Sequence, residues 1–148
     1  MTLNLRSSVV ICAPQKRIFD VISAPERLPE WNVSIERARR TVPEEPVGIG
    51  SRAIMSGRLL GAHIESETEV VEFEQPRLFC TRAVRGPKLS TRFTLEPMGE
   101  TTQVSVDVSG EVPGGSLGER LAEGFLRREL ALSLERLRTL GESQISNC

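Results

Sequence analysis

The strongest constraint on the fold is a series of five strand-like runs joined by turns of only two to four residues. These runs cover residues 51–59, 62–73, 78–85, 88–96 and 101–111 of the 148-residue chain. Two parallel strands need a crossover of about a dozen residues or more, and none of these turns is that long. The spacing therefore predicts an antiparallel meander of hairpins.

Further elements precede this meander. Residues 3–11 alternate between apolar and polar side chains, which is typical of a half-buried strand, and a second, more weakly patterned strand is expected at 34–42. Between them, Pro14 suits the first turn of a helix, because its missing N–H would have no partner there. Pro25 and Pro29 end that helix and confine the next one to about one turn. About seven strands are expected in total.

One long helix is predicted after the meander. Ser116 and Glu119 form a capping box, and Gly141 is a stop signal. Such a helix is about 36 Å long, and a nine-residue strand spans about 30 Å, so the helix can cross the whole sheet. We therefore expect an α+β fold, a curved antiparallel sheet around a long C-terminal helix, with a loose tail at 142–148. Apolar residues recur along this helix at Leu117, Leu121, Phe125, Leu126, Leu130, Leu134 and Leu137.

Composition excludes several classes of function. The length predicts a single domain over residues 1–148, and 19 Lys and Arg against 20 Asp and Glu give a net charge of −1. Nucleic-acid binding normally requires a basic face, so that partner is not expected. The sequence has no run of eighteen apolar residues and no signal-peptide pattern at its start, which predicts a cytoplasmic protein without a membrane span.

A metal site is not expected either. The single histidine, His63, and the three cysteines, Cys12, Cys80 and Cys148, lie far apart in the sequence. They do not provide the three or four convergent ligands that zinc requires. No metal and no other cofactor is therefore predicted.

Hairpin register predicts which side chains face the helix. Pairing through a two-residue turn at Gly86-Pro87 sets Arg82 opposite Thr91 and Cys80 opposite Phe93, and directly opposed residues share a face. The predicted inner face of the last three strands of the meander comprises Cys80, Arg82, Val84, Leu89, Thr91, Phe93, Val104 and Val106.

The turn at Leu60-Gly61 predicts the rest of the inner face. A β-bulge at Val70-Val71 is expected because two adjacent apolar residues cannot both point inward in a regular strand, and it would set Arg82 beside Thr68. The inner residues are Ala53, Met55, Gly57, Leu59, Ala62, Ile64, Ser66 and Thr68, and the outer ones are Arg52, Arg58, His63, Glu65, Glu67 and Glu69.

Four features could carry function, and each has a plainer alternative. An inward Arg82 would anchor a ligand oxygen, or it would pair structurally with Glu30 or Glu123, or it would be exposed if the register differs. Cys80 is core filling rather than a nucleophile, because no base lies near it in the predicted register. Trp31 is a wall of a cavity mouth or part of the core. The three outer glutamates are solvated charges rather than a catalytic or metal-binding cluster.

Several short motifs, taken in order, carry a family resemblance over nearly the full chain. They are Ile-Cys-Ala-Pro at 11–14, Phe-Asp-Val-Ile at 19–22, Pro-Glu-Arg-Leu-Pro-Glu-Trp at 25–31, Glu-Gln-Pro-Arg at 74–77 and Gly-Glu-Thr-Thr at 99–102. The chain resembles the polyketide cyclase/dehydrase and lipid transport branch of the START-like (SRPBCC) superfamily. That resemblance implies the helix-grip fold shared with Bet v 1, with a cavity for a small apolar molecule.

The resemblance leaves two functions open. The protein would bind a lipid, isoprenoid or polyketide-like ligand as a monomer or homodimer, or it would be an aromatase that closes and dehydrates a bound polyketone. No catalytic residue is assigned, and Arg82 is the one candidate. The ligand-binding residues expected from register and helix spacing are Trp31, Met55, Ile64, Ser66, Thr68, Cys80, Arg82, Thr91, Phe93, Val104, Val106, Leu121 and Phe125.

Overall fold

The computed structural model describes residues 2–111 and 116–143, with the backbone alone at 116–120. The strands are β1 (Thr2–Ile11), β2 (Ile35–Arg40), β3 (Arg52–Leu59), β4 (Ala62–Glu74), β5 (Leu78–Arg85), β6 (Lys88–Met98) and β7 (Thr101–Glu111). The helices are α1 (Gln15–Ile22), the 3-10 turn η1 (Pro25–Arg27), α2 (Leu28–Trp31) and α3 (Ser116–Glu142). No helix within these ranges is both long and apolar enough to cross a membrane.

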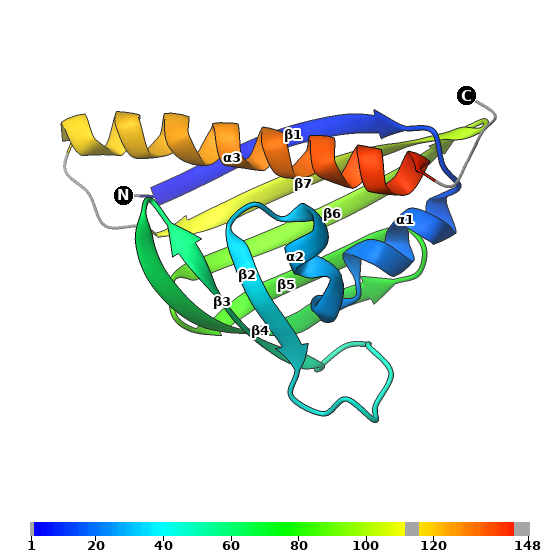
Figure 1. Cartoon of the computed structure of the whole chain (residues 1–148), viewed down its shortest axis with the longest axis horizontal. Helices are drawn as coiled ribbons and strands as arrows, with labels where there is room; N and C mark the ends of the chain where they lie inside the picture. The colour runs from blue at the N-terminus through cyan, green and yellow to red at the C-terminus, as the bar shows by residue number, and fades with distance from the viewer. Residues whose placement is uncertain (1, 112–115, 144–148) are drawn as a thin grey trace.

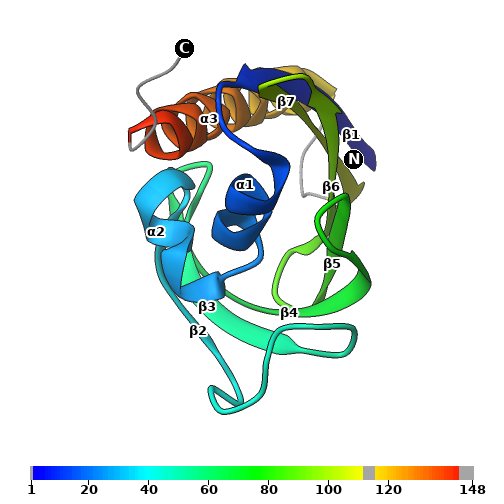
Figure 2. The ribbon, with the colours of Figure 1, turned by 90° about the vertical axis from the view of Figure 1, so that its right-hand side faces the viewer.

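The strands form one antiparallel sheet, in the order β1-β7-β6-β5-β4-β3-β2 across the described residues (Figure 1). Consecutive strands from β3 to β7 are neighbours, as the short turns between them predict. β2 pairs with β3 across a longer loop, and β1 closes the far edge by pairing with β7. The sheet curves strongly, so that its two edges approach α3 from opposite sides (Figure 2). The predicted α+β helix-grip architecture is confirmed.

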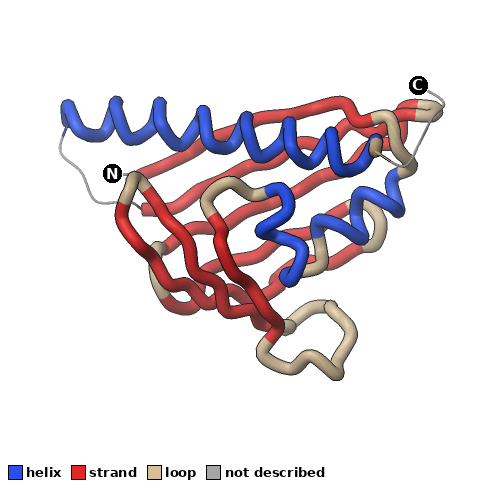
Figure 3. The backbone as a smooth tube through the Cα atoms, in the orientation of Figure 1, coloured by secondary structure: helices blue, strands red, loops and turns tan. Residues whose placement is uncertain are grey.

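The concave face of the sheet is filled differently at its two ends. At one end α1 inserts Ile18 and Phe19, both 0% exposed, and Phe19 meets Phe73 and Phe79 edge-to-face. At the other end Leu126 of α3 packs on Leu3 and Leu5 of β1. The tube in Figure 3 shows the short helices lying beneath α3 and a long loop between β2 and β3.

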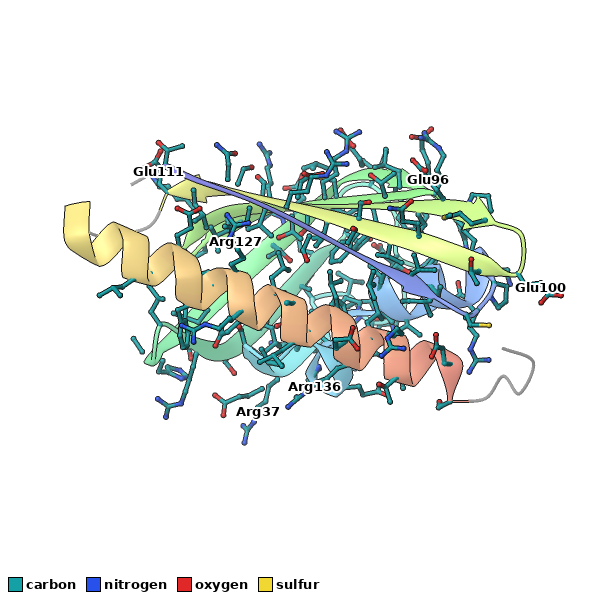
Figure 4. The ribbon with its side chains drawn as sticks, turned by 90° about the horizontal axis from the view of Figure 1, so that it is seen from above. Arg37, Glu96, Glu100, Glu111, Arg127 and Arg136 are labelled. Carbon is teal, nitrogen blue, oxygen red and sulfur yellow. The ribbon has the colours of Figure 1, made fainter. Side chains whose placement is uncertain are left out.

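Helix α3 runs along β1 and β7, as Figure 4 shows from above. It ends at Glu142, one residue past the predicted stop at Gly141, which packs against Ile11. Charged residues such as Arg37 and Glu100 lie at the periphery of the molecule (Figure 4). The predicted capping box at Ser116 and Glu119 and the Leu117 side chain lie outside the described side chains.

The β3–β4 hairpin has the predicted register. Leu59 pairs with Ala62, Met55 with Ser66 and Ala53 with Thr68, so the expected inner and outer faces are confirmed for these two strands. The expected bulge is also present, because the β4–β5 register shifts between Val70 and Glu72.

The predicted β5–β6 register is wrong by one residue. Phe79 pairs with Phe93 and Thr81 with Thr91, and the pairing stops at Arg82 and Ser90. The connection is therefore not a two-residue turn at Gly86-Pro87. A second register shift leaves Val84 unpaired on β5, because Thr68 pairs with Ala83 and Glu67 with Arg85.

This slip inverts the predicted faces of β5, because side chains alternate along a strand. Phe79, Thr81 and Ala83 face inward, while Cys80, Arg82 and Val84 belong to the outer face. The β6–β7 register differs by two residues, with Phe93 opposite Val106 rather than Val104. An even shift keeps the faces, so the inward direction of both valines is as predicted.

Candidate functional site

A cavity of about 230 Å³ lies between the inner face of the sheet, α3 and the segment from η1 to β2. It is smaller than the roughly 300–1,000 Å³ of common ligand sites. Its floor comes from β3 to β6, its roof from Leu126, Glu129, Leu130 and Ser133 of α3, and its wall includes Trp31. Most of the lining is apolar.

Threonine hydroxyls interrupt the apolar floor. Thr81 and Thr91 are directly opposed on β5 and β6, and Thr68 lies on the neighbouring strand β4. Within the described residues, no hydrogen bond to protein is made by the hydroxyls of these three threonines. Ser66 differs, since its Oγ donates to the carbonyl oxygen of Arg85 at 3.2 Å. The floor therefore presents three free hydroxyls to any occupant.

Among the described residues that line the cavity, Glu129 in the roof is the one carboxylate. Glu129 Oε2 accepts a hydrogen bond from Ser34 Oγ at 2.6 Å. One turn further along, Ser133 Oγ accepts from the backbone N–H of Val33 at 3.0 Å. Because both serines are cavity-lining residues, these bonds attach the start of β2 to α3 at the edge of the cavity.

Trp31 belongs to the core and also lines the cavity. It is 2% exposed and packs edge-to-face on Phe93, with ring centroids 5.9 Å apart. Its indole N–H is buried and has no hydrogen-bond partner among the described residues. The indole ring therefore contributes to the core by packing and not by a hydrogen bond to the described residues.

An ion pair that involves the lining residue Arg40 lies near the β2–β3 loop. Glu26 Oε2 accepts from the backbone N–H of Arg40 at 2.8 Å and from its Nε at 3.2 Å. Burial raises the pKa of Glu26, but the bonds and charge of Arg40 outweigh it, so the pKa lies below its ordinary value. Arg40 also donates from Nη1 to the carbonyl oxygen of Glu45 at 3.1 Å. Arg40 lines the cavity, yet its guanidinium is already engaged.

The structure brings most of the predicted ligand-binding residues to this cavity, but not all of them. Val104 and Val106 face inward, yet they are 0% exposed within the solid core and are not part of the lining. Leu121 and Phe125 are 73% and 38% exposed on α3. At about 100° per residue, Leu121 lies roughly 140° around the helix from buried Leu126. The predicted residues that line the cavity are Trp31, Met55, Ile64, Ser66, Thr68, Thr91 and Phe93.

Arg82 is not at the cavity, so the inward placement predicted for this catalytic and ligand-binding candidate is wrong. It is exposed on the outer face, opposite Glu69 on β4 rather than beside Thr68. The structural alternative fails as well, because Glu30 pairs with Arg27 at 3.0 Å and Glu123 with Arg127 at 2.8 Å. The predicted register placed the side chains of Cys80 and Arg82 on the inner face of β5, where Thr81 lies instead.

Cys80 is likewise on the outer face, where it is half-buried between Glu72 and Arg92. Burial, followed by the Glu72 carboxylate, raises the pKa of this thiol, and the charge of Arg92 offsets only part of that effect. The group is therefore held in its unreactive thiol form, because the thiolate is the nucleophile.

This chemistry can be measured directly. At neutral pH iodoacetamide should alkylate Cys80 more slowly in the folded protein than in urea, and the folded-state rate should keep rising at pH values above the ordinary pKa of cysteine. Mass spectrometry of the peptide that contains Cys80 separates it from the other cysteines. Equal rates in the folded and unfolded protein at neutral pH would contradict the assignment.

The outer glutamates of β4 form ion pairs, as expected for solvated charges. Arg52 bonds Glu67 at 3.2 Å and Glu69 at 3.3 Å, and His63 lies 3.9 Å from Glu65. Across residues 2–111 and 116–143, no group of three His, Cys, Asp or Glu side chains is placed to hold a metal ion.

The polar lining residues that sequence reasoning missed include Ser34, Thr81, Glu129 and Ser133. Glu129 and Ser133 could have been found from the sequence. They interrupt the apolar stripe of α3 that includes Leu126, Leu130 and Leu137. Polar residues inside such a stripe point to a polar or hollow surface beneath the helix.

Comparisons with known proteins agree on the fold. Residues 2–142 match the family described as polyketide cyclase / dehydrase and lipid transport. No match is found among curated proteins. All of the solved structures below are under 25% identical, so they support the fold alone.

Three solved structures illustrate the likeness. A START superfamily protein from Mycobacterium smegmatis is 23% identical, with a TM-score of 0.74 over 93% of this chain and 98% of its own. A protein from Thermus thermophilus is 17% identical, with a TM-score of 0.81 over 97% and 100%. The Zhui aromatase/cyclase from Streptomyces sp. R1128 is 13% identical, with a TM-score of 0.78 over 99% and 98%.

Proposed function

Because the chain belongs to the polyketide cyclase / dehydrase and lipid transport family, we propose that it binds a small hydrophobic molecule in the cavity beneath α3. The ligand would be a lipid, an isoprenoid or a polyketide-like compound. The observation that carries the proposal is the mostly apolar cavity, with Trp31 and Phe93 in its lining. The proposal takes residues 1–148 as one binding domain that acts in the cytoplasm as a monomer or homodimer.

The size and chemistry of the cavity favour a compact ligand. Apolar surface gains roughly 25 cal/mol for each Å² removed from water, so a ring system that fills the cavity can bind without any ion pair. At about 230 Å³ the space suits a short or cyclic molecule better than a long acyl chain. The three free threonine hydroxyls can orient a carbonyl or hydroxyl group on the ligand.

The lining also favours binding over catalysis. It contains no cysteine, histidine or lysine among the described residues, and Glu129 is its one carboxylate. General acid–base catalysis needs a titratable group within hydrogen-bond reach of the reacting atoms. A cyclase would therefore have to work with Glu129 and hydroxyl groups alone. The alternative has this one carboxylate in its favour, and a cyclised, dehydrated product recovered from a bound polyketone would support it.

Two adjacent residues on opposite faces of β5 provide the test. Ala83 lines the cavity, whereas its neighbour Val84 is 39% exposed on the other side of the sheet. Ala83→Phe would fill the cavity and should weaken binding of uncharged N-phenyl-1-naphthylamine by at least about tenfold, or 1.4 kcal/mol. Val84→Phe is the matched control and should leave affinity nearly unchanged.

The measurement is the gain in probe fluorescence on titration, with circular dichroism to confirm that both variants are folded. Energy transfer from Trp31, the only tryptophan, reports proximity to the wall. The proposal is contradicted if the folded wild type does not bind the probe, or if both phenylalanine variants bind it as tightly as the wild type.

A further inference from the structure

Glu129 combines three properties that no other charged side chain of the cavity shares. It lies on the inward face of α3, next to Leu130 and one turn from Leu126 and Ser133 in the roof. Its Oε2 is fixed by the 2.6 Å bond from Ser34 Oγ. In the described part of the chain, no protein group donates a hydrogen bond to its second oxygen, Oε1. The carboxylate is thus oriented while half of its accepting capacity stays free.

We propose that Glu129 is the polar anchor of the cavity and selects ligands that present a hydrogen-bond donor, such as an alcohol, a phenol or an amine, over ligands that present a carboxylate. This inference rests on the proposed function, because it concerns the specificity of the same cavity. An ionised carboxylate accepts hydrogen bonds and donates none. A ligand hydroxyl pointing at Oε1 therefore gains a charge-assisted bond, which is stronger than a bond between neutral groups.

The other charges of the lining do not favour an anionic ligand. The Arg40 guanidinium is held by Glu26 and by the carbonyl oxygen of Glu45. Arg52 belongs to the outer side of β3, where it bonds Glu67 and Glu69. A carboxylate in the cavity would thus meet the negative charge of Glu129 while both nearby guanidinium groups are already engaged by protein oxygens, and like charges repel strongly where water is excluded.

The threonine hydroxyls of the cavity floor are compatible with a ligand whose donor points at Glu129. The free hydroxyls of Thr68, Thr81 and Thr91 can each donate or accept, so they tolerate either polarity at the floor. Glu129 accepts only. Discrimination between a donor and an acceptor on the ligand therefore falls to the roof, and the floor contributes to affinity without setting the preference.

Four naphthalenes of one skeleton test the inference by calorimetry at neutral pH. Naphthalene carries no polar group, 2-naphthol a donor, 2-methoxynaphthalene an acceptor alone and 2-naphthoate an anion. We expect 2-naphthol to bind about tenfold to a hundredfold more tightly than 2-methoxynaphthalene, the range of a hydrogen bond to a charged group. We expect 2-naphthoate to bind more weakly than naphthalene itself.

Two substitutions assign the preference to the residue. Glu129→Leu should abolish the advantage of 2-naphthol while naphthalene still binds. Glu129→Gln keeps the size and an acceptor oxygen but removes the charge, so the affinity for 2-naphthoate should rise about tenfold relative to naphthalene. Glu123→Gln is the matched control, because Glu123 lies on the same helix, pairs with Arg127 at 2.8 Å and is not part of the lining. The relative affinities of the Glu123→Gln variant for the four naphthalenes should equal those of the wild type.

The outcomes separate the two proposals. If the wild type binds naphthalene but binds 2-methoxynaphthalene or 2-naphthoate as tightly as 2-naphthol, the inference about Glu129 is wrong and the binding function stands. The same holds if the preference for 2-naphthol persists in Glu129→Leu, or, should that variant not fold, if 2-naphthoate gains nothing in Glu129→Gln. If the folded wild type binds none of the four, the proposed function fails and the inference fails with it.

Discussion

Replacing Trp31 with alanine should lower the free energy of unfolding by about 3–5 kcal/mol, the range for removing a large aromatic side chain from a core. The residue is 2% exposed and packs on Phe93, with the ring centroids 5.9 Å apart. Because its place is at the end of α2 beside the cavity, the loss would merge the vacated space with the existing hollow. Urea unfolding followed by circular dichroism measures the change, since the fluorescence of Trp31 is lost with the residue.

Trp31→Phe is the matched variant. It retains a ring against Phe93 and removes an indole N–H that has no hydrogen-bond partner among the described residues. The free energy of unfolding should therefore fall only because the ring is smaller, by about 1–2 kcal/mol. Equal losses for the alanine and phenylalanine variants would show that the N–H, and not the packing of the ring, stabilises the protein.

Replacing Gly57 with alanine should cost about 1–3 kcal/mol or more, the range for overpacking a dense site. A Cβ atom at this position would overlap the carbonyl oxygen of Ser34 and lie about 3.0 Å from the Cα of Ile35. The obstacle is backbone, which no rotamer change can relieve. Ser34 also fixes Glu129, so the substitution should weaken the binding of 2-naphthol in addition to lowering stability.

Gly48→Ala is the control for this steric argument. No atom lies within 4 Å of a Cβ atom built at Gly48, so its stability should change by less than about 0.5 kcal/mol, as for most surface substitutions. Thermal or urea unfolding of both variants provides the comparison. A Gly57→Ala protein as stable as Gly48→Ala would mean that β2 does not approach β3 as closely as the structure has it.

The order of the strands from β3 to β7 was predictable because each turn between them is short, but register depends on the exact form of a turn. At Leu60-Gly61 the connection is a tight two-residue turn, and the alternation on both flanking strands agrees with it. In β5 the pattern is ambiguous, because Phe79 and Ala83 on one face compete with Cys80 and Val84 on the other. Alternation alone could not choose between them, and the unpaired Val84 was not visible in the sequence.

The candidate site was predictable only where it follows from strand alternation. Met55, Ile64, Ser66 and Thr68 reach the cavity because the β3–β4 register is correct. The partnership of Ser34 with Glu129 joins residues that are 95 positions apart. It depends on how α3 crosses the start of β2, and no local pattern encodes that crossing.

Val71 of β4 and Val84 of β5, which register shifts leave unpaired, have a consequence for how the width of the cavity could change in related chains. A β-bulge bends its strand and increases the local twist, and these two lie on adjacent strands in the middle of the sheet. The depth of the concave face is therefore set partly by backbone length rather than by the side chains that line it. Inserting or deleting a single residue in β4 or β5 would change the width of the cavity. Each such change would also reverse which side chains of that strand face the cavity.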